Sequence, residues 1–185
     1  MCLLLSRDWF VQPIVAHTGQ SAQPEVAYGD SVLVVVPDAI EREILIDAPP
    51  QVVWSIVTEA PHLAGWFSDE AEIDLRSGGR MLLTWRGHGT YVGRVETVDP
   101  PRLFAFRWQT REGEFSETNS TLVVMTLQAE ETGTRLRVAE SGFATLPWPD
   151  DARARYADEN SKGWLTELDE LRGYVARVVG ANSDR

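Results

Sequence analysis

The stretch that decides the fold runs from Pro149 to Val179, PDDARARYADENSKGWLTELDELRGYVARVV. Apolar side chains recur in it at intervals of four, three, four and three residues: Trp164, Leu168, Leu171, Val175 and Val178. That spacing places them in one stripe along an α-helix. The other face is charged, so the pattern predicts a long helix that is half-buried against a broad apolar surface. Gly163 disfavours helix by about 1 kcal/mol relative to alanine, so we expect a bend or a break there.

The region upstream of this helix alternates between apolar and polar residues over short segments, which is typical of half-buried β-strands. The predicted strands are 40–46, 72–75, 80–86, 91–97, 104–108, 123–127 and 135–140. Two short helices follow the first strand, one from Pro50 to about Glu59 and one over Pro61–Phe67. Tight turns such as Thr132-Gly133 indicate antiparallel pairing. The fold class is therefore α+β, with six to seven antiparallel strands and a long C-terminal helix.

The length and charge of the chain limit its class of function. The 185 residues suffice for one domain with a good core. The net charge of −11 and the isoelectric point of about 4.7 argue against nucleic acid and anionic membrane surfaces as partners, and the same charge also serves solubility. Cys2 is the only cysteine, which excludes an internal disulfide and fits a reducing, cytoplasmic location.

The N-terminal part of the chain differs from the rest. We interpret residues 1–38 as a poorly ordered extension, residues 39–180 as the domain, and residues 181–185 as a tail. An ordered arm that caps a cavity or a partner surface is the alternative for the extension. No stretch reaches the roughly 18 apolar residues of a membrane span, and the apolar start is cut short by Arg7 and Asp8. We therefore expect neither membrane insertion nor a signal peptide.

The run from Ile44 to Trp54, ILIDAPPQVVW, resembles the opening of the SRPBCC superfamily, whose members are also called START-like or Bet v 1-like. More narrowly, the sequence resembles homologues of the activator of the heat-shock protein (Hsp) 90 ATPase. The further matching motifs are Trp66-Phe67, Gly78-Gly79-Arg80, 98–103 (VDPPRL), 133–136 (GTRL), Ser141-Gly142-Phe143 and Gly163-Trp164. Their order and spacing carry the resemblance, which extends from about Ile40 to Val179.

The resemblance implies a helix-grip fold, in which a curved antiparallel sheet wraps around the C-terminal helix and a hydrophobic cavity often lies between them. Members of the superfamily bind lipids, sterols, polyketides or other apolar ligands, and some are cyclases or aromatases. The co-chaperone role belongs to eukaryotic members with an additional N-terminal domain. Residues 1–38 are too short to supply that domain, so the co-chaperone role is not carried over.

Side chains alternate between the two faces of a strand, so the sequence predicts which of them face the helix. The face of the sheet toward the helix is unusually aromatic. The expected cavity residues are Met81, Leu83, Trp85, Tyr91, Gly93, Phe104, Phe106, Trp108, Met125, Val138, Trp164 and Leu168. An apolar pocket with few polar groups is a common form of small-molecule site, whereas the alternative is a filled core in which the aromatic rings supply buried area. Gly93 lacks a side chain on this face, which either makes room for a ligand or admits a neighbouring indole.

Few polar residues are candidates for chemistry. Glu140 shares its parity with Leu136 and Val138, so we expect it to face inward near a cavity mouth, where it would act as a general base or bind a ligand. The alternative is a solvated carboxylate or one that caps the backbone. Tyr91 and Trp108 are candidates for orienting a ligand by hydrogen bonding. No pair of histidines has metal-ligand spacing, so neither a metal nor a cofactor is expected.

The sequence thus supports three interpretations. The first is a protein that binds a small apolar or amphipathic ligand, such as a lipid, sterol or polyketide-like molecule. The second is a cyclase, aromatase or hydrolase-like enzyme that uses Glu140 and Tyr91 in the same cavity. The third is a chaperone-activating or regulatory domain with a protein partner. Both a monomer and a homodimer are compatible with the sequence.

Overall fold

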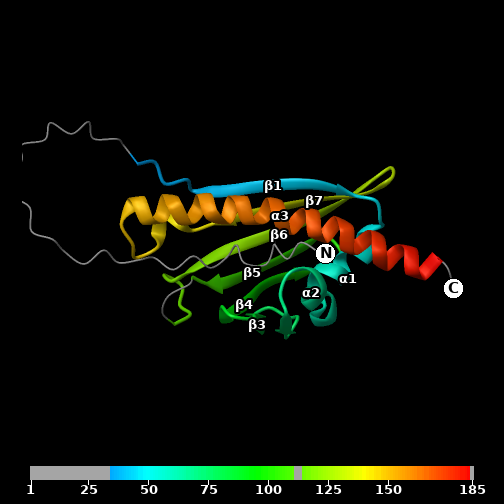
Figure 1. Ribbon diagram of the computed structural model, residues 1–185, viewed down its shortest axis with the longest axis horizontal. Helices are drawn as coiled ribbons and strands as arrows, with labels where there is room; N and C mark the ends of the chain where they lie inside the picture. The colour runs from blue at the N-terminus through cyan, green and yellow to red at the C-terminus, as the bar shows by residue number, and fades with distance from the viewer. Residues whose placement is uncertain (1–33, 111–113, 184–185) are drawn as a thin grey trace, which may run out of the picture.

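The computed structural model describes residues 34–110 and 114–183. Seven strands form one antiparallel sheet in the order β1-β7-β6-β5-β4-β3-β2 (Figure 1). The strands are β1 (Ala39–Ile46), β2 (Glu70–Ile73), β3 (Arg80–Trp85), β4 (Gly89–Asp99), β5 (Leu103–Gln109), β6 (Ser120–Glu130) and β7 (Gly133–Ser141). The predicted antiparallel sheet is confirmed, and β1 forms one edge of it, where it pairs with β7 from much later in the sequence.

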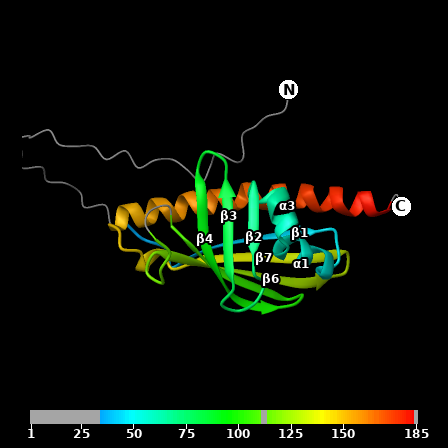
Figure 2. The same cartoon turned by 90° about the horizontal axis from the view of Figure 1, so that it is seen from below.

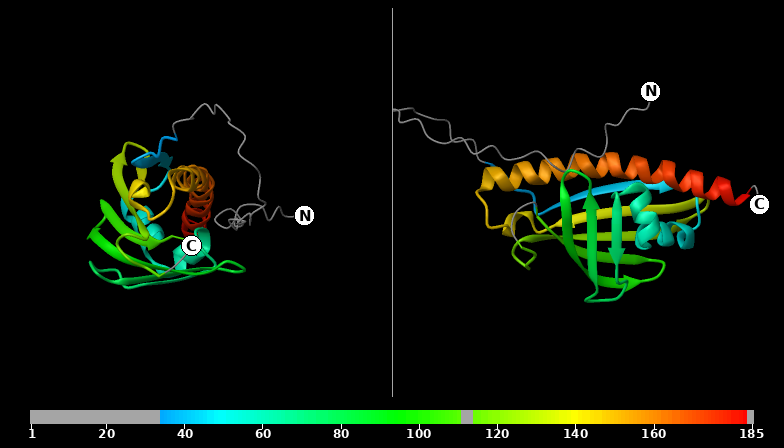
Figure 3. Two further views of the ribbon diagram at one scale, coloured as in Figure 1. Left: turned by 90° about the vertical axis from the view of Figure 1, so that its left-hand side faces the viewer. Right: turned by 60° about the horizontal axis from the view of Figure 1, so that its bottom comes forward.

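The helices lie as the sequence predicts. The two short helices after the first strand are α1 (Pro50–Thr58) and α2 (Ala60–Trp66), each with a proline in its first turn. A short 3-10 helix, η1 (Phe143–Thr145), leads into the long α3 (Asp150–Ser183). Figure 2 shows α3 running along one face of the sheet. Seen end on in Figure 3, the sheet curves around α3, which confirms the α+β helix-grip architecture.

The apolar stripe of α3 forms the contact with the sheet. Trp164, Leu168, Leu171 and Val175 are each at most 1% exposed. The helix is continuous through Gly163, so the expected break at this glycine is wrong. Tyr156 and Ala157 are buried before Gly163, and Trp164 and Leu168 are buried after it. This burial outweighs the small intrinsic penalty of one glycine, because packing rather than propensity supplies most helix stability in proteins.

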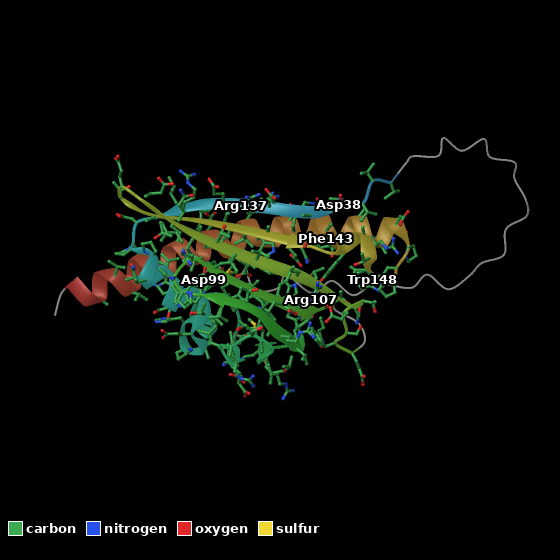
Figure 4. All side chains as sticks on the ribbon, turned by 180° about the vertical axis from the view of Figure 1, so that it is seen from behind. Asp38, Asp99, Arg107, Arg137, Phe143 and Trp148 are labelled. Atoms are coloured by element: carbon green, nitrogen blue, oxygen red, sulfur yellow. The ribbon has the colours of Figure 1, made fainter. Side chains whose placement is uncertain are left out.

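The face of the sheet that points away from α3 is charged. Arg137 pairs with Glu41 at 2.6 Å and Arg135 with Glu130 at 2.6 Å. Figure 4 views the molecule from this side, with Arg137 and Arg107 labelled. These groups are partly or largely exposed, so each pair contributes little to stability. The alternation of arginine and glutamate along the strands thus produces a solvated face, and the apolar residues between them face α3.

Gly93 in β4 is required by a close approach of the neighbouring strand. A Cβ atom at this position would lie 2.7 Å from the backbone oxygen of Arg107 on β5 and 3.4 Å from Cβ of Met81. The register between β4 and β5 shifts just beyond it, between Val95 and Thr97. The nearest group to Gly93 is therefore a backbone carbonyl, and Trp108 lies opposite Gly93 in the register of β4 and β5.

Within the described residues, no helix combines the length and the apolar character needed to cross a membrane.

We predict that Gly93→Ala lowers the free energy of unfolding by about 1–3 kcal/mol, because the new methyl group overlaps the Arg107 carbonyl. Urea unfolding followed by circular dichroism measures this change. The matched control is Gly180→Ala in the exposed last turns of α3, where an added Cβ meets nothing within 4 Å. The control should be neutral or stabilising by up to about 1 kcal/mol. Equal effects of the two substitutions would contradict the assigned role of Gly93.

Candidate functional site

The candidate site is centred on Glu140, which lies on β7 and faces α3. Its backbone pairs with Ile40 of β1 on one side and with Val123 of β6 on the other. The side chain is 0% exposed. The inward orientation agrees with strand parity, but the expected position near a cavity mouth is wrong, because the carboxylate is enclosed completely.

The Glu140 carboxylate accepts hydrogen bonds from four side chains. Oε1 accepts from the hydroxyl of Thr121 at 2.5 Å and from Nε1 of Trp108 at 3.0 Å. It also accepts from Nδ2 of Asn160 at 3.0 Å. Oε2 accepts from Nε1 of Trp164 at 2.8 Å. The donors come from β5, β6 and α3, so one carboxylate ties three strands to the helix.

Opposing effects act on the pKa of Glu140. Burial disfavours the charged form and raises the pKa above the ordinary glutamate value of 4.5. The hydrogen bonds from Thr121, Trp164, Trp108 and Asn160 favour the charged form and lower it, but burial is the larger effect. The resulting pKa is raised, as is common for carboxyl groups at functional sites.

Two of the four donors were missed by sequence reasoning. Thr121 lies two residues before Val123 and thus has the inward parity of β6. Asn160 lies one helical turn before Trp164, on the buried face of α3. A polar residue that interrupts an apolar stripe was the available signal in both cases. Such a residue must find a partner when it is buried, and Glu140 is that partner.

An aromatic cluster around Phe67 adjoins the carboxylate. The Phe67 ring stacks on Trp164 with centroids 5.5 Å apart and on Trp108 at 5.8 Å. It meets Trp85 edge to face at 5.7 Å and lies 5.0 Å from Trp66. Phe67 follows the last residue of α2 and was not among the predicted cavity residues.

The indole nitrogens of this cluster all donate hydrogen bonds. Trp85 donates to the backbone oxygen of Phe67 at 2.9 Å, and Trp66 donates to that of Ile56 at 3.1 Å. Trp108 and Trp164 donate to Glu140 as described. Each ring is therefore held in one orientation, and the cluster presents fixed aromatic walls.

The structure brings the predicted cavity residues together between the sheet and α3. The following are at most 4% exposed: Met81, Leu83, Trp85, Phe104, Phe106, Trp108, Met125, Val138, Trp164 and Leu168. Gly93 is buried, and Tyr91 is partly exposed with its ring 5.3 Å from that of Trp85. Much of the space between these residues is occupied by their own rings and by Phe67.

The two proposed acid–base residues lie on separated strands. Glu140 is on β7 and Tyr91 is on β4, with β6 and β5 between them. Three strand spacings correspond to about 14 Å along a sheet. The structure thus does not bring Glu140 and Tyr91 together as a catalytic pair.

Surface hollows formed by the described residues are lined by residues other than the predicted cavity residues. One, of about 570 Å³, lies between α2 and α3 and is lined by Gly65, Trp66, Thr166, Asp169, Glu170, Gly173 and Arg177. Two of about 420 and 340 Å³ adjoin the turn between β6 and β7. Among the described residues, no group of three or more histidine, cysteine, aspartate and glutamate side chains is arranged to hold a metal ion.

We predict that Glu140 makes the stability of the protein fall as pH rises above about 4.5. The unfolded chain releases the Glu140 proton at its ordinary pKa, whereas the folded protein retains it up to the raised pKa. In this window the folded state binds more protons, so the free energy of unfolding declines with a slope of up to about 1.4 kcal/mol per pH unit. Glu140→Gln does not titrate and should lack this component.

Urea unfolding of the wild type and of Glu140→Gln at several pH values from 4 upward would measure the difference. Glu72→Gln, at an exposed position on β2, is the control for loss of a solvated carboxylate. A wild-type advantage that stays constant or grows with pH would contradict a raised pKa of Glu140.

Comparisons with known proteins agree with this architecture. A comparison with curated proteins found no match. Among solved structures, protein MLL2253 from Mesorhizobium loti is 23% identical with a TM-score of 0.65, over 75% of this chain and 97% of that one. DynU16, a protein in the dynemicin biosynthetic locus, is 23% identical with a TM-score of 0.62, over 76% of this chain and 48% of that one.

The Aha1 dimer from Colwellia psychrerythraea, determined in solution, is 20% identical with a TM-score of 0.61, over 74% of this chain and 95% of that one. At this level of identity the three structures show a shared fold. Residues 47–176, well over half of the chain, match a family described as activator of Hsp90 ATPase homolog 1-like protein. The fold, the matched range and the motifs agree, and the chain belongs to the family of activator of Hsp90 ATPase homolog 1-like proteins.

Proposed function

We propose that the protein binds a small apolar or amphipathic molecule in the aromatic interior between the sheet and α3. The observation that carries this proposal is the buried Glu140, whose carboxylate holds the indoles of Trp108 and Trp164. A charge-bearing group is costly to bury, and well-packed apolar residues often serve stability equally well or better. Its presence is therefore better explained by the need to fix two aromatic walls than by stability alone.

Phe67 is the side chain that a ligand would displace. It fills the space against Trp108 and Trp164, and it is carried by the end of α2 rather than by the sheet or α3. The two indoles are fixed by Glu140, whereas the Phe67 ring is held by packing alone because it has no polar atom. Movement of this one ring would expose the faces of both indoles to a ligand.

The environment of Glu140 favours binding over catalysis. A general base must reach the proton that it abstracts, within hydrogen-bond distance or through one water. The Glu140 oxygens instead face four donors of the protein itself. The enzyme interpretation would require these contacts to open. The similarity of the fold to DynU16, from a biosynthetic locus, supports a small-molecule ligand, whether the protein only binds it or also converts it.

A screen of fatty acids, sterols and aromatic polyketides by native mass spectrometry tests the proposal. We expect at least one class to form a one-to-one complex and to raise the thermal midpoint, because a ligand that binds the folded state stabilises it by mass action. Absence of any complex and of any thermal shift across the three classes would overturn the proposed function.

The substitution Phe67→Leu tests the location of the site. Leucine buries less apolar area than phenylalanine, so a ligand that displaces it loses roughly 1.4 kcal/mol less free energy of burial. This difference corresponds to about tenfold tighter binding of the ligand. Isothermal titration calorimetry with the best ligand of the screen measures the change. The matched control is Phe143→Leu, at the phenylalanine labelled in Figure 4. Phe143 is fully buried in η1, and its ring packs on Tyr156 of α3. The control should leave affinity unchanged, and equal effects of the two variants would place the ligand elsewhere.

A further inference from the structure

Two polar atoms near the contact of β1 with α3 are buried and have no hydrogen-bond partner among the described residues. They are Nε of Arg42, on β1, and Oδ1 of Asn160, on α3. The first is a donor and the second an acceptor. Leaving such atoms without a partner is costly, and native proteins satisfy most of them.

The remaining polar atoms of both side chains are held in place. Nη1 of Arg42 donates to the backbone oxygen of Glu41 at 2.7 Å, and Nη2 donates to the hydroxyl of Ser161. Asn160 is 0% exposed, and its Nδ2 donates to Glu140. The amide nitrogen faces Glu140 Oε1, which also accepts from Thr121 and Trp108, so the amide oxygen faces away from the carboxyl group. The orientation of Oδ1 is thus set by the same carboxylate that fixes the two indoles.

The two atoms belong to one neighbourhood of the interior. Asn160 precedes Ser161, which is the partner of Arg42. Arg42 pairs with Val138 and Ile40 pairs with Glu140, so Arg42 and Glu140 are diagonal neighbours on the inner face of β1 and β7. Trp164, a wall of the aromatic cluster, lies one helical turn after Asn160. The polar pair therefore lies at the edge of the proposed ligand site.

We propose that Arg42 Nε and Asn160 Oδ1 form a polar subsite that recognises a neutral hydroxyl group of the bound molecule. A hydroxyl both accepts and donates, so it satisfies the two atoms together. A ligand carboxylate offers only acceptors, so it could not hydrogen-bond to the Asn160 oxygen, and it would lie close to Glu140. A ligand ammonium offers only donors, so it could not hydrogen-bond to Arg42 Nε, and its charge would be repelled by the guanidinium. The ligand class is thus an alcohol or a phenol on an apolar body, and this inference rests on the proposed function.

Three probes of similar size separate these possibilities: 2-naphthol, 2-methylnaphthalene and 2-naphthoate. Calorimetric titration of the wild type should give an affinity for 2-naphthol at least about tenfold higher than for 2-methylnaphthalene, from two added hydrogen bonds, one of them donated by the charged guanidinium of Arg42. The affinity for 2-naphthoate should be lower than that for 2-naphthol. A crystal structure of the 2-naphthol complex should show its oxygen within hydrogen-bond distance of both atoms.

Two variants locate the hydroxyl preference. Arg42→Lys keeps a positive charge but removes the Nε donor, and Asn160→Ala removes the acceptor. Each should reduce the preference for 2-naphthol over 2-methylnaphthalene to about threefold. The control is Arg137→Lys, at an exposed position on the outer face of β7, which should leave the preference unchanged. The wild-type preference is measured without any variant, so the test stands even if a variant fails to fold.

The outcomes distinguish the subsite from the proposed function. Equal affinity for 2-naphthol and 2-methylnaphthalene would overturn the subsite while leaving ligand binding in place. A water molecule that stays between the two atoms in the 2-naphthol complex would do the same. If none of the three naphthalenes binds, the subsite is overturned, and the lipid, sterol and polyketide screen independently decides the proposed function.

Discussion

The interior of this protein depends on one buried carboxylate. Glu140 accepts hydrogen bonds from Trp108, Thr121, Asn160 and Trp164, which come from two strands and the long helix. An isolated charge at such a depth would be prohibitive, and four donors offset much of its desolvation. The same bonds fix the rotamers of two indoles and the orientation of one amide. One residue thereby links the packing of α3 on the sheet to the geometry of the candidate site.

The aromatic cluster shows how a ligand-binding fold and a packed core are compatible. Phe67 occupies the place between Trp108 and Trp164 and contacts both faces by stacking. Sheet and helix supply the fixed walls, and the end of a short helix supplies the ring that fills the space. The backbone of Phe67 is held by hydrogen bonds to Leu63 and Trp85, so the movement that admits a ligand is a rotation of its side chain. The family resemblance and the packed interior are thus not in conflict.

Prediction from the sequence succeeded where a pattern repeats. Strand alternation placed Leu83, Phe106 and Val138 on the inner face, and helical spacing placed Leu168 and Leu171 on the buried stripe of α3. Prediction failed where a single tertiary contact or the packing of a helix determines the local structure. Gly93 is required by a backbone carbonyl of the adjacent strand, and Gly163 is tolerated within a helix buried on both sides of it. Neither effect depends on residues close in sequence.

The amino-acid sequence by itself determined the strand and helix periods, the antiparallel order, the inward parity of Glu140 and the aromatic character of the inner face. These properties follow from local spacing and from side-chain polarity. Only the tertiary structure decided the partners of Glu140, the stacking of Phe67 between two indoles, and the pairing of Arg42 with Ser161 across more than one hundred residues. Such contacts depend on how distant segments pack in space, and the register and curvature of the sheet select among many partners that the sequence alone leaves equivalent.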